Sequence, residues 1–179
     1  DLKYVDLKKY KESDEVMTIY KDYGIEEMNE LMVSKQADFV MLMFALDTLF
    51  DEETRKKNFI YYEERTIHDS SLSKCTHAIL ANDLDMQDMA YDMYESAIRI
   101  DLGPYMKSSK DGIHSASIGG IWQGTVMGFG GVRMEGDLLR IAPKLPKQWD
   151  TLEFPLMLQG NPLWISASHE EVVVENKGS

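Results

Sequence analysis

The stretch Lys35-Gln-Ala-Asp-Phe-Val-Met-Leu-Met-Phe-Ala-Leu46 constrains the fold more than any other part of this sequence. A helical pattern extends from Lys35 to Phe50 and is apolar on nearly all sides, so the helix must be surrounded by other elements. Its apolar run, residues 39–46, is far shorter than the roughly 18–20 residues needed to cross a bilayer. We therefore predict a buried helix. A helical toroid, in which an outer ring of helices encloses an inner ring, would supply the surroundings that it needs.

The rest of the chain divides into a helical part and a β part at Gly130-Gly131. Before these glycines, the sequence pattern predicts further helices at 72–82, 84–102 and 113–128. After them, short runs broken by turn residues predict antiparallel strands at 132–135, 138–142, 152–158, 163–168 and 172–175. Gly136-Asp137 and Gly160-Asn161 are placed for hairpin turns. The predicted fold class is α+β, with helices first and a small antiparallel sheet after them.

The start of the chain resembles neither a natural N-terminus nor a signal peptide. Residues 1–33 are acidic, rich in tyrosine and weakly periodic, so we expect coils or short helices that pack against something outside the chain. The sequence opens without a methionine and lacks the positive start, apolar stretch and cleavage site of a signal peptide. We expect a fragment of a longer protein, although a processed or recombinant end would look the same.

Composition argues against several classes of function. The sequence has 179 residues, with 31 Asp or Glu against 19 Lys or Arg, and a formal net charge of -12. A polyanion would be repelled, which argues against nucleic acid as a partner. The single cysteine, Cys75, excludes an internal disulfide, and no C-x-x-C metal pattern is present. We expect a soluble protein of the reducing cytoplasm, with no membrane partner, no metal and no cofactor.

The polar stretch Thr66-Ile-His-Asp-Ser-Ser-Leu-Ser73 lies directly before a predicted helix. Hydroxyl groups and unpaired backbone N–H groups at a helix start can bind an anion, and the helix dipole adds to the attraction. The simpler interpretation is that Asp69, Ser70 or Ser71 only caps the helix, which is the commoner use of such residues. The residues alone leave both interpretations open.

A second polar stretch is Asp111-Gly-Ile-His-Ser-Ala-Ser-Ile-Gly-Gly-Ile-Trp122. It predicts an Asp-Gly turn, then His114 at the start of a helix, and small residues that let a ligand or another backbone approach. Gly119 and Gly120 each cost about 1 kcal/mol relative to alanine inside a helix, so a packing or functional reason is expected. The alternative to a binding site is tight helix packing with a structural His114.

A third candidate is Ser34-Lys-Gln-Ala-Asp38, at the head of the apolar helix. Lys35 in the first turn opposes the helix dipole, a small cost that a bound carboxylate, phosphate or sugar hydroxyl could offset. The alternative is a lysine that simply extends to solvent. Tyr61, Tyr62 and Trp122 could stack on a sugar face and are equally suited to a core.

Five motifs resemble, in order and spacing, the C-terminal half of glycoside hydrolase family 65. They are KQAD at 35–38, YYE at 61–63, TIHDSSLS at 66–73, DGIHSASIGGIW at 111–122, and GFGG followed by LPKQW within 128–149. The resemblance covers about residues 30–155, and its specificity comes from the ordered set, since any one motif would be weak. The family contains the inverting phosphorylases for maltose, trehalose, kojibiose and nigerose.

The resemblance implies an architecture and a set of partners. Family members have an N-terminal β-sandwich, an (α/α)6 barrel with the active site, and a small C-terminal β domain. Residues 1–129 would then hold the last helices of the barrel, and residues 130–179 would form the C-terminal β-sheet domain. The missing N-terminal part of the same polypeptide would be one partner. A second copy of the chain is another, because homodimers are common among similar proteins.

The resemblance also implies roles for individual residues. Lys35 and Gln36 match sugar-binding residues at the subsite where cleavage occurs, and His68 is assigned to the sugar with them. Ser70, Ser71 and His114 match phosphate-binding residues. Gly119 and Gly120 would be backbone neighbours of the phosphate.

The implied reaction is reversible phosphorolysis. Inorganic phosphate, the co-substrate, would attack the anomeric carbon of an α-linked glucose disaccharide, with maltose as first candidate, and yield β-glucose 1-phosphate. Because phosphate is already an anionic nucleophile, the second carboxylate that activates water in inverting hydrolases is not needed. The general acid of the family is a Glu in an upstream Gly-Pro-Asp-Glu-type motif, and no such motif occurs here. We therefore predict no catalytic residue in this chain and no activity of the chain alone.

Two other functions remain open at this point. A hydrolase of the same superfamily would need a water-activating carboxylate where this sequence has serine. A noncatalytic sugar-binding module would follow if no acid-bearing barrel half preceded this chain.

Overall fold

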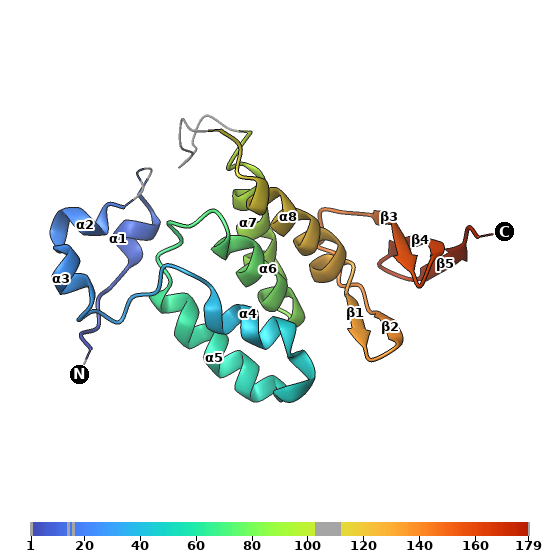
Figure 1. Cartoon of the computed structure of the whole chain (residues 1–179), viewed down its shortest axis with the longest axis horizontal. Coiled ribbons are helices and arrows are strands. Elements are labelled where there is room, and N and C mark those ends of the chain that lie inside the picture. The colour runs from blue at the N-terminus through green and yellow to red at the C-terminus, as the bar shows by residue number, and fades with distance from the viewer. Residues whose placement is uncertain (1, 14, 16, 103–111, 179) are drawn as a thin grey trace.

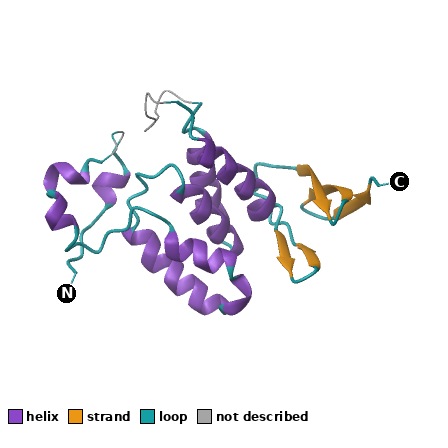
Figure 2. Cartoon of the chain, viewed as in Figure 1, coloured by secondary structure: helices purple, strands orange, loops and turns teal. Residues whose placement is uncertain are grey.

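The computed structural model describes residues 2–13, 15, 17–102 and 112–178. Within them the chain forms a helical part followed by two small antiparallel sheets (Figures 1 and 2). This confirms the mixed class, with helices first and strands after them. Asp111, with which the predicted Asp-Gly turn begins, lies outside the described residues.

The described residues among the first 33 form a small helical lobe of their own. It contains three one-turn helices, α1 (Lys8–Lys11), α2 (Ile19–Asp22) and α3 (Ile25–Met28). Leu7, Tyr10 and Ile19 are buried against Ile67, which belongs to the Thr66–Ser73 motif. The lobe therefore packs on this chain, where the sequence suggested a surface outside it.

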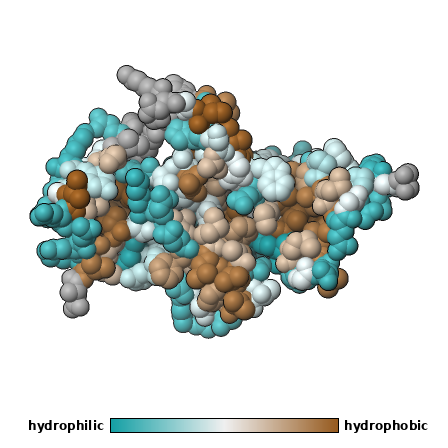
Figure 3. Space-filling model, in the orientation of Figure 1, coloured by the Kyte–Doolittle hydropathy of each residue, from teal (hydrophilic) through white to brown (hydrophobic). Residues whose placement is uncertain are grey.

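The helix predicted at 35–50 is shorter and less buried than expected. The structure has α4 (Asp38–Ala45) and a 3₁₀ turn (Asp47–Leu49), because Ser34 pairs with Thr66 in an isolated β-bridge and keeps the start of the segment extended. Val40, Met43 and Phe44 are buried, while the other side is exposed. Figure 3 shows hydrophobic surface over the region where Figure 1 places α4 and the turn after it.

The central buried helix is instead α6 (Ser73–Asp83), which has nine buried residues. It packs against α4, α7 (Gln87–Ile98), α8 (Ser115–Gln123) and the π-helical turn η2 (Gly124–Phe129). Its buried positions include Ser, Cys, Thr and Ala, whose small side chains allow close approach. Gly120 and Gly128 show how closely these elements approach α6, since a Cβ on either glycine would lie only 3.1–3.2 Å from α6 side chains.

Helix α5 (Glu52–Arg65) was not predicted. Its first half is a run of charged residues without an apolar stripe, which hides the period of the helix. The N-cap signal was available, because the Asp51 carboxylate accepts a hydrogen bond from the Thr54 backbone N–H at 2.7 Å.

The β part contains a hairpin and a three-stranded sheet. The hairpin pairs β1 (Val132–Glu135) with β2 (Leu138–Ile141), and the sheet has the order β3 (Thr151–Leu158), β4 (Asn161–Ser168), β5 (Val172–Asn176). All pairs are antiparallel. Gly136 and Gly160 have φ values of 62° and 82°, so both predicted turns use the left-handed conformation that glycine tolerates.

Ion pairs and aromatic packing join the β part to the helices. Arg133 of β1 makes hydrogen bonds of 3.0 and 3.1 Å with both carboxylate oxygens of Asp83, at the end of α6, and Arg55 of α5 reaches the same carboxylate at 2.7 Å. Trp149, in the LPKQW motif, packs against Tyr94 and Phe129. None of the helices within the described residues is long and apolar enough to cross a membrane.

Candidate functional site

The two motifs that the sequence predicts to bind phosphate lie near the end of α7. Lys74, in the first turn of α6, donates to the Ser96 hydroxyl near the end of α7 at 2.5 Å. A Cβ on Gly120 of α8 would touch Cys75, also in the first turn of α6, at 3.1 Å. Asp101, which follows α7, lies at hydrogen-bond distance from His114 at the N-cap of α8, so the end of α7 lies beside the start of α8 as well as the start of α6. Gly120, in the second half of α8, provides the contact between α8 and α6.

The Ser70-Ser71 loop has an open helix start beside it. The Ser70 hydroxyl accepts the Leu72 backbone N–H at 3.2 Å, so this serine stabilises the turn before the helix. No side chain caps α6 at Leu72, and the Ser71 hydroxyl has no hydrogen-bond partner among the described residues. Asp69 instead accepts the Met17 backbone N–H at 2.9 Å. The capping interpretation thus explains Ser70 in part and leaves Ser71 available.

A buried hydrogen-bond network connects the Ser70-Ser71 loop to the neighbouring helices. Glu63, at the end of α5, lies 2.5 Å from Nδ1 of His77 and 3.0 Å from Nε2 of His68. Lys11 of the N-terminal lobe donates to the same carboxylate at 3.0 Å. Nδ1 of His68 lies 2.9 Å from the Ser73 hydroxyl. The network thus links α1, α5, the loop and the first residue of α6.

The electrostatics of the network follow from burial and hydrogen bonding. Burial raises the pKa of the Glu63 carboxyl, but the hydrogen bonds from His68 and His77 outweigh it and bring the pKa well below its ordinary value. Burial lowers the pKa of His68, against the opposing effect of Glu63. A neutral His68 donates from Nε2 to Glu63 and accepts the Ser73 hydroxyl at Nδ1.

This geometry changes the role assigned to His68. Both of its ring nitrogens have partners, the residue is buried, and its φ of 58° is uncommon for a residue other than glycine. No ring nitrogen is left for a sugar hydroxyl in this arrangement. The sugar-binding role of His68 therefore has no support from the geometry, which favours a role in holding the serine loop.

Glu63, His68 and His77 also resemble a metal-ligand set. One ligand atom from each lies within 4.8 Å of the others. Carboxylate and imidazole groups suit zinc. However, the Lys11 ammonium on the Glu63 carboxylate would repel a cation, and both histidines already lie at hydrogen-bond distance from that carboxylate. The arrangement fits a hydrogen-bonded network better than a metal centre.

His114 is held by a residue that the sequence did not single out. It occupies the N-cap of α8, where its backbone N–H donates to Asp101 at 3.0 Å and its Nδ1 lies 2.8 Å from the other oxygen of the same carboxylate. These hydrogen bonds lower the pKa of Asp101.

The two glycines of α8 face different surroundings. A Cβ on Gly119 would meet nothing within 4 Å, whereas one on Gly120 would press on Cys75. Close packing against α6 is therefore enough to explain a glycine at position 120. At position 119 nothing crowds the backbone, so a ligand could approach it as the sequence predicts.

The candidate sugar residues are brought near the loop by the β-bridge. The Ser34 N–H donates to the Arg65 carbonyl at 2.7 Å, and the Ile67 N–H donates to the Ser34 carbonyl at 2.9 Å. Lys35 and Gln36 follow this bridge and are exposed. Trp122 and Tyr61 are also exposed, while Tyr62 stacks on Phe39 with ring centroids 4.4 Å apart.

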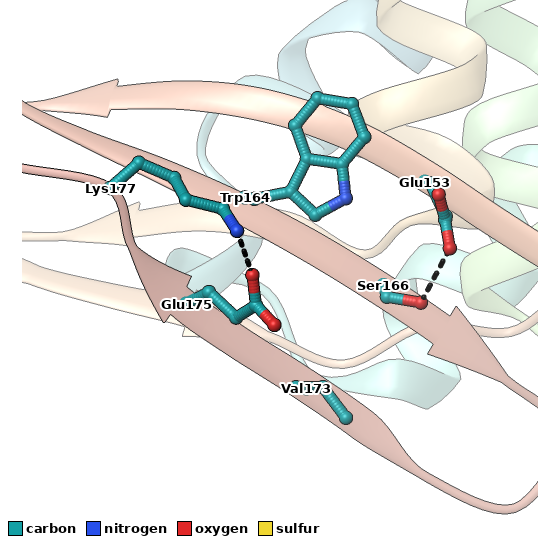
Figure 4. A pocket seen from close by; sticks show the side chains of 6 residues that line it. All are labelled: Glu153, Trp164, Ser166, Val173, Glu175 and Lys177. Carbon is teal, nitrogen blue, oxygen red and sulfur yellow. Dashed lines mark hydrogen bonds and ion pairs between the residues drawn. The ribbon is translucent and has the colours of Figure 1, made fainter.

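A separate open hollow of about 540 Å³ lies on the three-stranded sheet (Figure 4). It is lined by Glu153, Trp164, Ser166, Val173, Glu175 and Lys177. Figure 4 shows Trp164 between a Ser166–Glu153 hydrogen bond and a Lys177–Glu175 ion pair. None of the residues predicted for sugar or phosphate lines this hollow.

Comparison with known proteins assigns the chain to a family. The model of the glycosyl hydrolase family 65 central catalytic domain matches residues 1–123, and the model of the family 65 C-terminal domain matches residues 132–179. The chain belongs to glycosyl hydrolase family 65. This confirms the resemblance carried by the five motifs.

Individual relatives are named as disaccharide phosphorylases. A kojibiose phosphorylase of Halothermothrix orenii is 42% identical over 97% of the chain, which spans 22% of that protein. A maltose phosphorylase of Bacillus subtilis is 32% identical over 88% of the chain, which spans 21% of that protein. A solved structure described as a candidate kojibiose phosphorylase from the human microbiome matches 99% of the chain, with a TM-score of 0.89 and 31% identity, and the chain covers 24% of it.

Family 65 membership does not test the individual roles. The assignments of Lys35, Gln36, His68, Ser70, Ser71, His114, Gly119 and Gly120 stay predictions, and the hydrogen bonds of His68 favour a supporting role for that residue. Glu63, His77, Lys11 and Asp101 are the contributors that sequence reasoning missed. The signal in the sequence was His77, a polar residue among the small residues of a predicted helix. A buried histidine needs a hydrogen-bond partner, which here is Glu63.

Proposed function

We propose that this chain is the C-terminal part of an inverting phosphorylase that cleaves an α-linked glucose disaccharide with inorganic phosphate. The products would be β-glucose 1-phosphate and glucose. The observation that carries the proposal is that the end of α7 is bonded to both parts of the predicted phosphate site, since Ser96 bonds to Lys74 in the first turn of the uncapped helix α6 and Asp101 bonds to His114 at the start of α8. The names of the family 65 relatives support it.

The chemistry suits phosphate better than water as the nucleophile. Hydroxyls, backbone N–H groups at a helix start and an imidazole can bind and orient an anion. A hydrolytic site would need a carboxylate placed to activate water. Glu63 and Asp101 do not serve that purpose, because their oxygens are held by histidines within the chain.

Kojibiose is the disaccharide that we would test first. The sequence alone suggested maltose, but the relative named as a kojibiose phosphorylase is more similar to this chain than the one named as a maltose phosphorylase. The loops that contact the leaving sugar would belong to the upstream part of the barrel.

The proposal includes a division of labour within a longer protein. Residues 1–129 would complete an (α/α)6 barrel, residues 130–179 would form the C-terminal domain, and the general acid would come from the upstream part. The exposed apolar side of α4 is consistent with a missing neighbour. A cytoplasmic location and a homodimer complete the proposal. The chain alone should therefore be inactive, and phosphorolysis by the isolated chain would contradict this.

The test is to incubate the full-length protein with kojibiose, maltose, trehalose and nigerose, each with and without phosphate. The proposal expects glucose 1-phosphate from at least one disaccharide and only when phosphate is present. Release of two glucose molecules without phosphate would show a hydrolase. Binding of a disaccharide with no turnover under either condition would show a sugar-binding module.

A further inference from the structure

Asp101 makes two hydrogen bonds to a single residue. One carboxylate oxygen accepts the backbone N–H of His114 at 3.0 Å, and the other lies 2.8 Å from its Nδ1. The backbone bond fixes the first residue of α8, and the ring bond fixes the orientation of the imidazole. A single hydrogen bond would leave either the peptide or the ring free to rotate.

The ring bond also decides which nitrogen remains for a ligand. An ionised carboxylate can only accept, so Nδ1 of His114 must carry a proton. Nε2 is then the ring nitrogen without a hydrogen-bond partner among the described residues. The side chain is 23% exposed, so the imidazole is in part accessible to a small solute.

Asp101 is itself held in place by the helices that frame the serine loop. It lies three residues beyond the last residue of α7, which packs along α6. The Lys74 to Ser96 hydrogen bond ties the end of α7 to the start of α6. The position of His114 is therefore set relative to Ser71 through α7.

We propose that Asp101 is a positioning residue for phosphate, which acts through His114 by fixing its Nδ1–H tautomer and aiming Nε2 at the anion. This inference rests on the proposed function. Asp101 is not a catalytic residue, because its two oxygens are occupied by His114 and it needs no contact with substrate. In this tautomer Nε2 is an acceptor, and it can accept the P–OH hydrogen of hydrogen phosphate.

The test compares Asp101→Asn with His114→Ala and with the double variant in the full-length enzyme. The side chain of asparagine has one oxygen where Asp101 has two. It cannot accept the backbone N–H of His114 with one oxygen and the Nδ1–H with another, so the tautomer of His114 is no longer fixed. We expect the KM for phosphate to rise on the order of 10- to 100-fold, by analogy with residues that orient metal-binding histidines. The KM for the disaccharide should stay within about twofold of the wild-type value, because a twofold change corresponds to less free energy than the loss of one hydrogen bond.

The double variant separates positioning from a general structural role. If Asp101 acts only through His114, the double variant will be no worse than His114→Ala alone. Asp92→Asn, an exposed carboxylate on α7, is the matched control and should leave both KM values unchanged. Thermal unfolding of each variant verifies the fold.

The outcomes are distinct. A rise in the KM for phosphate with a non-additive double variant supports the inference. Additive losses, or equal rises in both KM values, overturn it while leaving the phosphorylase proposal in place. Wild-type enzyme without any phosphate-dependent turnover would overturn the proposed function and the role of Asp101 with it.

Discussion

Replacing Glu63 with glutamine should lower the free energy of unfolding by about 3 kcal/mol at pH 7. The carboxylate is 15% exposed and accepts hydrogen bonds from His68, His77 and Lys11. Glutamine keeps the size but offers one oxygen, so either the histidines or the lysine must face an NH₂ group that cannot accept. Breaking a buried charged pair costs about 3–5 kcal/mol, and partial exposure of Lys11 places this case at the lower end.

The assay is urea unfolding followed by circular dichroism, with Glu64→Gln as the matched control. Glu64 is the exposed neighbour, and its replacement should change stability by less than about 0.5 kcal/mol. Folding lowers the pKa of Glu63 from 4.5, so its contribution is present above that pH and is lost as the pH falls toward the folded value. The advantage of the wild type over Glu63→Gln should therefore shrink in acid. Equal losses in both variants, or a difference independent of pH, would refute the reasoning.

Three further predictions concern the joint between the two parts and the serine loop. Asp83→Asn should destabilise the protein by about 3 kcal/mol in urea unfolding, because it removes the carboxylate that both guanidinium hydrogen bonds of the buried Arg133 reach and leaves only Asp47, at 3.7 Å, as a charged partner. Gly131→Ala should lower the midpoint of thermal unfolding far more than Gly136→Ala, since both have positive φ but only a Cβ at 131 would lie 1.9 Å from a backbone oxygen. Ser71→Ala should raise the KM for phosphate about tenfold, the loss of one hydrogen bond to a charged group, with little change in the KM for the disaccharide. Equal rises in both KM values would show that Ser71 is structural.

The β part could be predicted from sequence because its signals are local. Alternating apolar residues and glycines at the turns fix each strand, so the strand predicted at 132–135 agrees with β1 at both ends. Gly136 and Gly160 adopt the positive φ that a short hairpin needs. Nothing outside each hairpin is required to place these elements.

The helical part was harder because burial depends on neighbours. The apolar run at 39–46 suggested the most buried helix, but α6 is the most buried helix in the structure, since its small residues let five other elements pack against it. The charged start of α5 hides its helical period. The apolar pattern of a segment shows which of its side chains can be buried, but it does not show which other elements pack against that segment.

The sequence predicted the motifs of the candidate site but not the residues that hold these motifs in place through hydrogen bonds. The sequence places serines and a histidine at helix starts, and in the structure both helix starts are bonded to the end of α7. Asp101 and Glu63 could not be found in this way, because each lies far along the chain from at least one of its partners. Hydrogen bonds between distant residues leave no periodic signal.

The stereochemistry of the product tests the central claim most directly. Proton NMR of the full-length enzyme acting on kojibiose and phosphate can follow the anomeric signal of glucose 1-phosphate as it forms. An inverting phosphorylase must produce the β anomer from an α-linked disaccharide, and no glucose 1-phosphate should form when phosphate is left out. Formation of the α anomer, or release of glucose at the same rate without phosphate, would contradict the account.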